Sequence, residues 1–376
     1  MYKKILILAI FVLFMSVQIS YALSAQSAIL IDGHTGRVLL EHNSYQRRGM
    51  ASTTKIMTAL VAIESGKLSD IVTVSNSAAN VEGSSMWLKS GEKISVESLL
   101  FGLMLNSGND AATALAEYIG GDVPKFAEMM TKKAKSLGLE NTSFTNPHGL
   151  DNENHYTTAY DLAQITRYAL SNKKFAEIVS SKKKIVEWED NEWGRSLRNH
   201  NKMLTMYQGA DGVKTGFTKK CGRCLVSSAT RDNLKLIAVT LNAPSDWHDH
   251  TGMLDFGFSK YNYKKVIGKG DYMKTLPVLN GVTDSISLYA NADVELAITD
   301  KEENSIKTVY NIPENLVAPI EMGQKIGSVD VFLSDKLVAR VDLISDSTVS
   351  MNIESNFWTK LNYLMQNLLS NFVKHI

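Results

Sequence analysis

The sequence predicts a mixed α/β fold: one domain that combines an antiparallel sheet with a helical subdomain, followed by a small all-β domain. Strand-like runs stand at both ends of residues 25–262 with helical periods between them, which is typical of helices packed on a sheet. Residues 265–352 instead alternate short strands with Asn, Asp and Gly turns. The chain of 376 residues, 44% hydrophobic and 21% charged, is long and apolar enough for two or three folded domains.

Residues 1–24 have the character of a signal peptide. Two lysines precede an apolar stretch of about 13 residues at 5–17, and small residues follow at Ser20, Ala22 and Ser24. An uncleaved membrane anchor is the weaker alternative, because a spanning helix needs about 20 apolar residues. We therefore expect an exported protein that works outside the cytoplasm, without cytosolic ATP or NAD.

The elements of the first domain, residues 25–262, follow in order. Residues 28–31 and 37–40 flank a Gly-rich turn and predict a hairpin. Apolar residues at helical spacing then predict helices at 53–63, 99–105, 111–118, 124–137 and 160–170. Strands predicted at 225–228 and 234–241 close the domain, so the sheet is expected to be antiparallel.

Residues 265–352 keep a strand character throughout, and no helical period survives there. Strands are predicted at 285–289, 294–298, 306–312 and 336–343. This segment holds no catalytic constellation, so its expected role is to space or dock the first domain.

Residues 355–376 predict an amphipathic helix. Polar residues interrupt the segment too often for a spanning helix, so we expect it to lie in a membrane interface and to hold the protein on the outer face of the cytoplasmic membrane. A helix docked on the protein's own core is the alternative. The apolar residues recur at three and four positions; they are Phe357, Trp358, Leu361, Leu364, Met365, Leu368, Leu369, Phe372, Val373 and Ile376.

Charge and cysteine content exclude several classes of protein. The chain has 40 Lys and Arg against 39 Asp and Glu, so no imbalance points to nucleic acid. Two cysteines cannot build a disulfide scaffold or a four-Cys zinc site. No His-Glu-x-x-His is present, His248-Asp249-His250 is interpreted as surface residues, and we expect no metal or organic cofactor.

Cys221 and Cys224 have Cys-x-x-Cys spacing. Redox catalysis normally places such a pair at a helix start, whereas this pair sits beside a predicted strand. A structural or incidental pair is favoured, and a disulfide is the alternative.

Ser52-Thr53-Thr54-Lys55 opens an apolar helix and is the first motif with chemical content. Residues three apart share a helix face, so the Lys55 amine is expected to reach the Ser52 hydroxyl. A desolvated lysine with a lowered pKa serves as the base that a nucleophilic serine needs. The spacing alone is weak evidence, since it also occurs in four polar stretches of this chain.

Two further motifs follow. Ser107-Gly108-Asn109 lies between two predicted helices and is expected to present Ser107 as a proton relay and Asn109 as a donor to substrate, an ordinary turn being the alternative. Lys214-Thr215-Gly216 suits a strand edge along which a peptide pairs. Gly216 is expected to leave room for the substrate backbone, and Lys214 to supply a cation for a carboxylate.

Together the three motifs, 55 residues from Ser52 to Ser107 and 162 from Ser52 to Lys214, match the set used by penicillin-binding proteins and class A β-lactamases. The chain resembles the low-molecular-mass penicillin-binding proteins, the serine D-Ala-D-Ala carboxypeptidases (peptidase S11-like). The resemblance extends to residues 51–58, 107–112, 148–151 and 211–216, to both chain ends and to the β-rich segment.

The resemblance implies a penicillin-binding/β-lactamase-like transpeptidase domain that acts on peptidoglycan stem peptides ending in D-Ala-D-Ala and is acylated by β-lactams. It implies that Ser52 is the nucleophile and Lys55 its base, and that Ser107 relays a proton to the leaving amine. Lys214 and Thr215 would hold the terminal carboxylate. Backbone N–H groups of Ser52 and Phe217 would form the oxyanion hole.

His148 would lie near the pocket, with a structural loop histidine as the alternative. The sequence departs from many relatives in having Phe217, not His, after Lys-Thr-Gly. It also has no Arg in residues 241–255, where some relatives use one for the carboxylate, so recognition is expected to rest more on Lys214 and Thr215. Phe217 and residues 221–225 look closer to the branch found in endospore-forming bacteria.

Three rival functions remain open: a DD-endopeptidase or a β-lactamase with the same triad, and a cell-wall docking protein whose site is vestigial. A class A lactamase should show Glu-x-x-Leu-Asn between Ser107 and Lys214, which is absent. The three intact motifs disfavour the vestigial protein. The sequence therefore favours a serine D-Ala-D-Ala carboxypeptidase.

Overall fold

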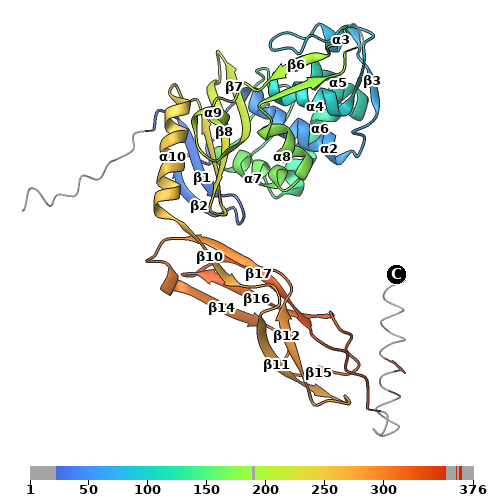
Figure 1. The fold of residues 1–376 in the computed structure, drawn as a ribbon, viewed down its shortest axis with the longest axis vertical. Helices are drawn as coiled ribbons and strands as arrows, with labels where there is room; N and C mark the ends of the chain where they lie inside the picture. The colour runs from blue at the N-terminus through green and yellow to red at the C-terminus, as the bar shows by residue number, and fades with distance from the viewer. Residues whose placement is uncertain (1–22, 189–190, 353–360, 362–363, 366–376) are drawn as a thin grey trace, which may run out of the picture. The chain divides into compact units, whose positions relative to one another are not determined.

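The computed structural model describes residues 23–188, 191–352, 361 and 364–365 (Figure 1). By its contacts the chain divides into two units, Met1–Arg231 with Lys235–Gly257 and Asp232–Leu234 with Phe258–Ile376. Nearly all of the expected signal peptide and of the expected C-terminal helix falls outside the described residues. Across the described part of the chain, no helix has both the length and the apolar character that crossing a membrane requires.

A five-stranded sheet with the order β2–β1–β9–β8–β7 forms the frame of the first unit. Strand β1 pairs antiparallel with β2 and with β9, and β7 pairs antiparallel with β8. The predicted hairpin and the predicted closing strands are therefore confirmed, and β7 is an edge strand. The bounds are β1 (Ser27–Asp32), β2 (Val38–His42), β7 (Ala210–Thr218), β8 (Gly222–Arg231) and β9 (Leu234–Leu241).

Alternate residues of a strand point to opposite faces of the sheet, so apolar side chains on both faces need to be buried. Helices cover both faces of this sheet. Ile29 and Ile31 belong to the main core, together with buried residues of the helical part. Leu30 points the other way, where a Cβ at Gly257 in helix α10 (Asp246–Lys260) would lie 3.0 Å from its Cδ2. Figure 1 shows α10 on one side of strands β1 and β8, and α7 and α8 on the other side.

The helical part is built around α2 (Lys55–Glu64), in which every residue from Lys55 to Ile63 is buried. The predicted helices are all present, and side chains cap the N-termini of three of them, with Ser95 before α4, Asp122 before α6 and Thr158 before α7. The surrounding helices are α4 (Val96–Leu105), α5 (Asn109–Gly120), α6 (Val123–Ser136), α7 (Ala159–Leu170) and α8 (Lys173–Ser180). Short elements complete the unit: η1 (Ala51–Thr54), α3 (Asn76–Ala79), α9 (Met203–Met206), and the hairpins β3 (Ile71–Thr73) with β4 (Lys93–Ser95) and β5 (Lys183–Val186) with β6 (Arg195–Arg198).

The second unit is a β structure with its own hydrophobic core, as the sequence predicts. Its main sheet has the order β14–β16–β17–β12–β11–β15, and β10 pairs with β13. Between residues 262 and 345, its one helical element is the short turn η2 (Glu303–Ser305). The strands are β10 (Asn262–Ile267), β11 (Tyr272–Leu279), β12 (Ser285–Ala290), β13 (Val294–Ile298), β14 (Ile306–Asn311), β15 (Leu316–Val317), β16 (Lys325–Leu333) and β17 (Lys336–Ser345).

Candidate active site

Ser52 and Lys55 meet where η1 passes into α2. The Lys55 Nζ atom lies 2.9 Å from Ser52 Oγ, so the spacing of three residues produces the contact that the sequence predicts. Gly149 packs against this turn with φ +90°. A Cβ at position 149 would lie 1.9 Å from the Ala51 carbonyl oxygen, so no side chain fits there. The hydroxyl and the amine are therefore placed by local backbone geometry.

The Lys55 amine is fully buried, and its other two contacts are with neutral oxygens. It donates to Asn109 Oδ1 at 2.7 Å and to the His148 carbonyl oxygen at 2.7 Å. Burial holds the pKa of Lys55 well below its usual range, the nearby charge of Lys214 lowers it further, and Asp110 opposes both effects. A lysine in this environment is prepared to accept a proton.

Ser107 lies in the loop between α4 and α5, and it is a buried residue with φ +58°. A non-glycine residue in this region is uncommon and points to a conformation imposed by its surroundings. The Gly108 N–H donates to the Gly102 carbonyl, and the Asn109 N–H donates to Ser84. These bonds hold the Ser107 side chain at the surface of a cleft that Ser52 also lines.

Asn109 is buried, and both the oxygen and the nitrogen of its side-chain amide form hydrogen bonds within the protein. Its Oδ1 accepts from Lys55, and its Nδ2 donates to the Glu82 carbonyl at 2.6 Å. The structure therefore shows Asn109 positioning the Lys55 amine against the loop of residues 82–92. Donation to substrate, the role expected from the sequence, stays a prediction.

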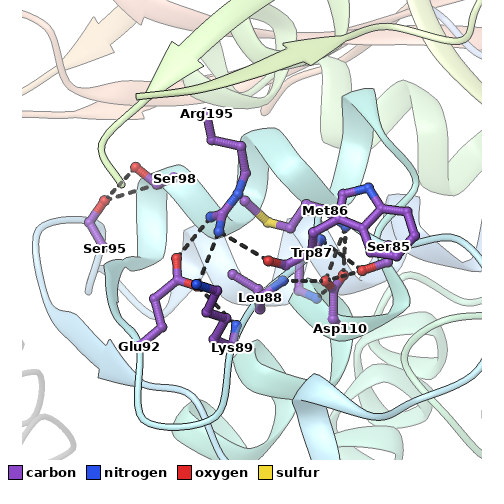
Figure 2. A network of polar contacts seen from close by, with 11 residues as sticks. Ser85, Met86, Trp87, Leu88, Lys89, Glu92, Ser95, Ser98, Asp110 and Arg195 are labelled. Carbon is purple, nitrogen blue, oxygen red and sulfur yellow. Dashed lines mark hydrogen bonds and ion pairs between the residues drawn. The ribbon is translucent and has the colours of Figure 1, made fainter. Parts of the chain in front are cut away.

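A buried polar network holds that loop (Figure 2). Asp110 accepts hydrogen bonds from the Met86 and Leu88 N–H groups and from Ser85 Oγ. Arg195 pairs with Glu92 through two hydrogen bonds of 2.9 and 3.1 Å and donates to the Trp87 carbonyl. No sequence pattern predicts this network, because Arg195 is more than a hundred residues from Glu92 and Trp87.

Lys214 lies on the edge strand β7, where it is fully buried. Burial lowers its pKa to about 7, and its Nζ donates to the Thr215 carbonyl at 2.9 Å. Thr215, Gly216 and Phe217 follow along the strand and line the cleft.

Gly216 lies where strand β7 approaches the turn η1. A Cβ at Gly216 would lie 2.9 Å from the Ser52 nitrogen and 3.0 Å from the Thr53 nitrogen. The missing side chain therefore lets β7 approach η1 closely. Room for a substrate backbone, the role expected from the sequence, stays a prediction.

His148 contributes its backbone to the site. Its carbonyl accepts from Lys55, while its ring Nδ1 accepts from the Leu150 N–H at 3.3 Å. Burial, with the charges of Lys55 and His155, lowers the pKa of His148 to about 3, so the ring is neutral. Its imidazole is not among the cleft-lining groups of the described residues, so contact with substrate stays a prediction.

The cleft itself is open and has a volume of about 300 Å³. Sequence reasoning missed several of its residues, above all Arg223 on β8, which forms an ion pair with Asp246 at 2.9 Å. The sequence has no Arg at 241–255, and the Arg that lines this cleft comes from strand β8. The complete lining is Ser52, Ser84, Ser107, His200, Thr215, Gly216, Phe217, Arg223, Asp246 and Trp247.

The remaining candidates lie outside the cleft. Cys221 and Cys224 are free thiols, so the structure does not contain the alternative disulfide. The interpretation of His248-Asp249-His250 as surface residues is wrong for two of the three. Asp249 is buried and accepts from Ser24, and the His250 ring is fully buried between the Ser227 and Thr240 hydroxyls.

Comparison with known proteins extends this picture. The sequence model described as D-alanyl-D-alanine carboxypeptidase matches residues 15–245. The chain belongs to this family. A second model, the C-terminal domain of penicillin-binding protein 5, matches residues 261–351.

Other D-alanyl-D-alanine carboxypeptidases resemble the chain over most of its length. The carboxypeptidase DacF of Bacillus subtilis is 37% identical over 81% of this chain and 80% of its own. DacA of Haemophilus influenzae is 33% identical over 93% and 91%. The crystal structure of penicillin-binding protein 5 from Haemophilus influenzae superposes with a TM-score of 0.74 at 34% identity, covering 88% of this chain and 98% of that one.

Membership in the D-alanyl-D-alanine carboxypeptidase family confirms the resemblance stated from the motifs, the fold class and the enzyme class. The chain is a hydrolase of the cell wall with a penicillin-binding fold.

Proposed function

We propose that the enzyme removes the terminal D-Ala from peptidoglycan stem peptides through an acyl-Ser52 intermediate. The observation that supports this most directly is the set of three contacts around the Lys55 amine. A neutral amine has two N–H donors and one lone pair. The Asn109 and His148 oxygens accept from the two N–H groups, which leaves the lone pair for the Ser52 hydroxyl at 2.9 Å.

Acylation follows from this arrangement. Ser52 Oγ attacks the carbonyl carbon of the penultimate D-Ala while its proton passes to Lys55, which becomes an ammonium. The oxyanion that forms receives hydrogen bonds from the Ser52 and Phe217 N–H groups. The close approach of β7 to η1 at Gly216 supports this pairing.

Departure of the D-Ala amine requires a proton. Lys55 returns the proton it took, and Ser107, on the same cleft, passes it to the leaving nitrogen as the C–N bond breaks. Water then attacks the acyl-enzyme, with Lys55 again as base, and releases the shortened peptide and free Ser52.

Substrate binding is assigned to the edge of β7. An extended peptide adds to an exposed strand through main-chain hydrogen bonds, while Lys214 and Thr215 hold its terminal carboxylate. The same edge accepts the β-lactams that mimic the peptide. Asn109 and His148 complete the site through their contacts with Lys55.

The location of the enzyme is part of the proposal. A signal peptide at 1–24 exports the chain, and the amphipathic helix at 355–376 holds it peripherally on the outer face of the cytoplasmic membrane, with residues 265–352 as a spacer for the peptidase domain at 25–262. Truncation before residue 356 should release the enzyme from membranes and leave its peptidase activity. Continued membrane association would contradict the anchor.

The chemistry is tested by brief exposure to labelled penicillin, followed by intact-mass analysis and peptide mapping. The wild type should carry one covalent adduct at Ser52, and the Ser52→Ala variant none. Fast release of the hydrolysed drug would favour a β-lactamase, and cleavage confined to cross-linked peptides an endopeptidase. A wild type that is never labelled would indicate a vestigial site.

A further inference from the structure

Arg223 occupies a position in the cleft that the three motifs do not explain. It lies on β8 directly opposite Phe217, and Thr215 is two residues before Phe217 on β7. Residues two apart on a strand and their cross-strand partners share a face, and diagonal neighbours lie about 7–8 Å apart, within reach of a long side chain. Thr215, Phe217 and Arg223 accordingly line the same cleft.

The Arg223 guanidinium is held on one side only. Its Nε donates to Asp246 Oδ1 at 2.9 Å, and its central carbon lies 5.9 Å from the centre of the Trp247 ring. Among the described residues, neither terminal nitrogen has a hydrogen-bond partner, and the side chain is 42% exposed. The guanidinium of Arg223 therefore lines the cleft, is held at Nε and keeps its terminal nitrogens available, and a planar guanidinium is able to bind a carboxylate through two hydrogen bonds.

Asp246 explains the orientation of this fork. Its carboxylate is buried and also accepts from the Trp247 N–H at the start of α10. The Asp246 carboxylate accepts a hydrogen bond from Arg223 at Nε only. The positive charge of Arg223 also neutralises this carboxylate, which would otherwise repel an anionic ligand in the cleft.

The other cation at this end of the site, Lys214, is enclosed and does not rule out a second cation for the carboxylate. Lys214 is fully buried, and its amine already donates to the Thr215 carbonyl. An anion beside Thr215 therefore meets one enclosed amine and one exposed, permanently charged guanidinium.

We infer that Arg223, oriented by Asp246, binds the terminal carboxylate of the substrate next to Thr215 and makes the enzyme specific for a free C-terminus. The inference rests on the proposed carboxypeptidase function, and it assigns to β8 a specificity residue outside the three motifs.

The test compares two substrates: an N-acylated peptide ending in D-Ala-D-Ala, and the same peptide with a C-terminal amide. Arg223→Gln should lower kcat/KM for the free acid about 10- to 100-fold, mainly through KM, and change kcat/KM for the amide by less than about 3-fold. Arg223→Lys should fall between, because it keeps the charge and loses the fork. Arg231→Gln, at the far end of the same strand, is the matched control.

The double variant Arg223→Gln/Asp246→Asn covers the case in which the single variant unfolds, because it removes the buried carboxylate left without a partner. An unchanged ratio of acid to amide activity in the folded Arg223→Gln enzyme or in this double variant would overturn the inference. A wild type that is not labelled by penicillin and cleaves neither peptide would instead overturn the proposed function.

Discussion

At the scale of single residues, the candidate site depends on neutral oxygens around a buried amine. A carboxylate beside Lys55 would keep it protonated, whereas the Asn109 amide and the His148 carbonyl orient it without doing so. The one nearby carboxylate whose charge opposes the lowered pKa, Asp110, is occupied by backbone N–H groups and Ser85. Burial among neutral oxygens, with the nearby charge of Lys214, therefore favours the uncharged amine of Lys55.

The pH dependence of kcat/KM follows from the two lysines. The value should rise as pH climbs through the lowered pKa of Lys55, and fall above about pH 7 as Lys214 loses the charge that attracts the carboxylate. The pKa values of Lys55 and Lys214 are lower in the folded protein than in the unfolded chain, so folding releases protons from both amines. For Lys214, the free energy of unfolding should therefore rise with pH between about 7 and 10.5. Lys214→Arg should move the alkaline limb upward, and a limb that stays in place would show that another group causes it.

Gly149 offers a test of how the turn at Ser52 is held. A Cβ there would lie 1.9 Å from the Ala51 carbonyl oxygen at φ +90°, so Gly149→Ala should cost at least about 3 kcal/mol and slow acylation by penicillin. Gly138 has φ +77° with open space around it, and Gly138→Ala should cost only about 1–2 kcal/mol. Urea unfolding measures both, and equal costs would mean that the contact with Ala51 is unimportant.

What the sequence predicts about the site depends on how local the contact is. Ser52 reaches Lys55 because three residues of a helix bring them together, and this needs no tertiary information. The carbonyl of His148 and the absent side chain of Gly216 act through the backbone, so residue type does not reveal their roles. Arg223 reaches the cleft through strand pairing, which a search along 241–255 could not find.

At the scale of elements, the sequence analysis missed helices α8 and α10 for different reasons, since α8 is amphipathic but short and α10 has a weak helical period. Helix α10 contains Gly252 and Gly257 and opens with Asp, Trp and His residues, a composition with low helix propensity, and it forms because it covers a face of the sheet. Helix α8 has only eight residues and begins at the cap supplied by Asn172. Packing against the sheet stabilises α10, whereas α8 depends on its Asn172 cap and its buried apolar face.

The β5–β6 hairpin places like charges opposite one another, Lys183 against Arg198. Directly opposed like charges destabilise a strand pair, so Arg198→Glu and Lys183→Glu should each stabilise the fold by about 0.2–1 kcal/mol at low salt. The double variant restores repulsion with the opposite sign and should lose the gain. Thermal unfolding at two salt concentrations measures the effect, and additive gains in the double variant would contradict a pairwise cause.

At the scale of the whole molecule, the two units have separate hydrophobic cores. Every cleft residue belongs to the first unit, and so does every contact of Lys55. We therefore expect the β unit to be dispensable for the chemistry at Ser52, and its role as a spacer stays a prediction.

A chain that ends after Lys260 should fold on its own and be acylated by penicillin at a rate within about 2-fold of the full-length rate. Stopped-time labelling of both proteins measures this, with Ser52→Ala in each background as the control. A shortened chain that is soluble but labelled much more slowly would show that the β unit supports the site.

The edge position of β7 limits what the enzyme is able to discriminate. A ligand that extends a sheet is held by its amide groups, and its side chains point away to either side. Exchanging residues upstream of the cleaved bond should therefore be tolerated, whereas N-methylation of the peptide should not. Stem peptides that differ in their side chains would therefore present the same backbone hydrogen-bonding groups to β7.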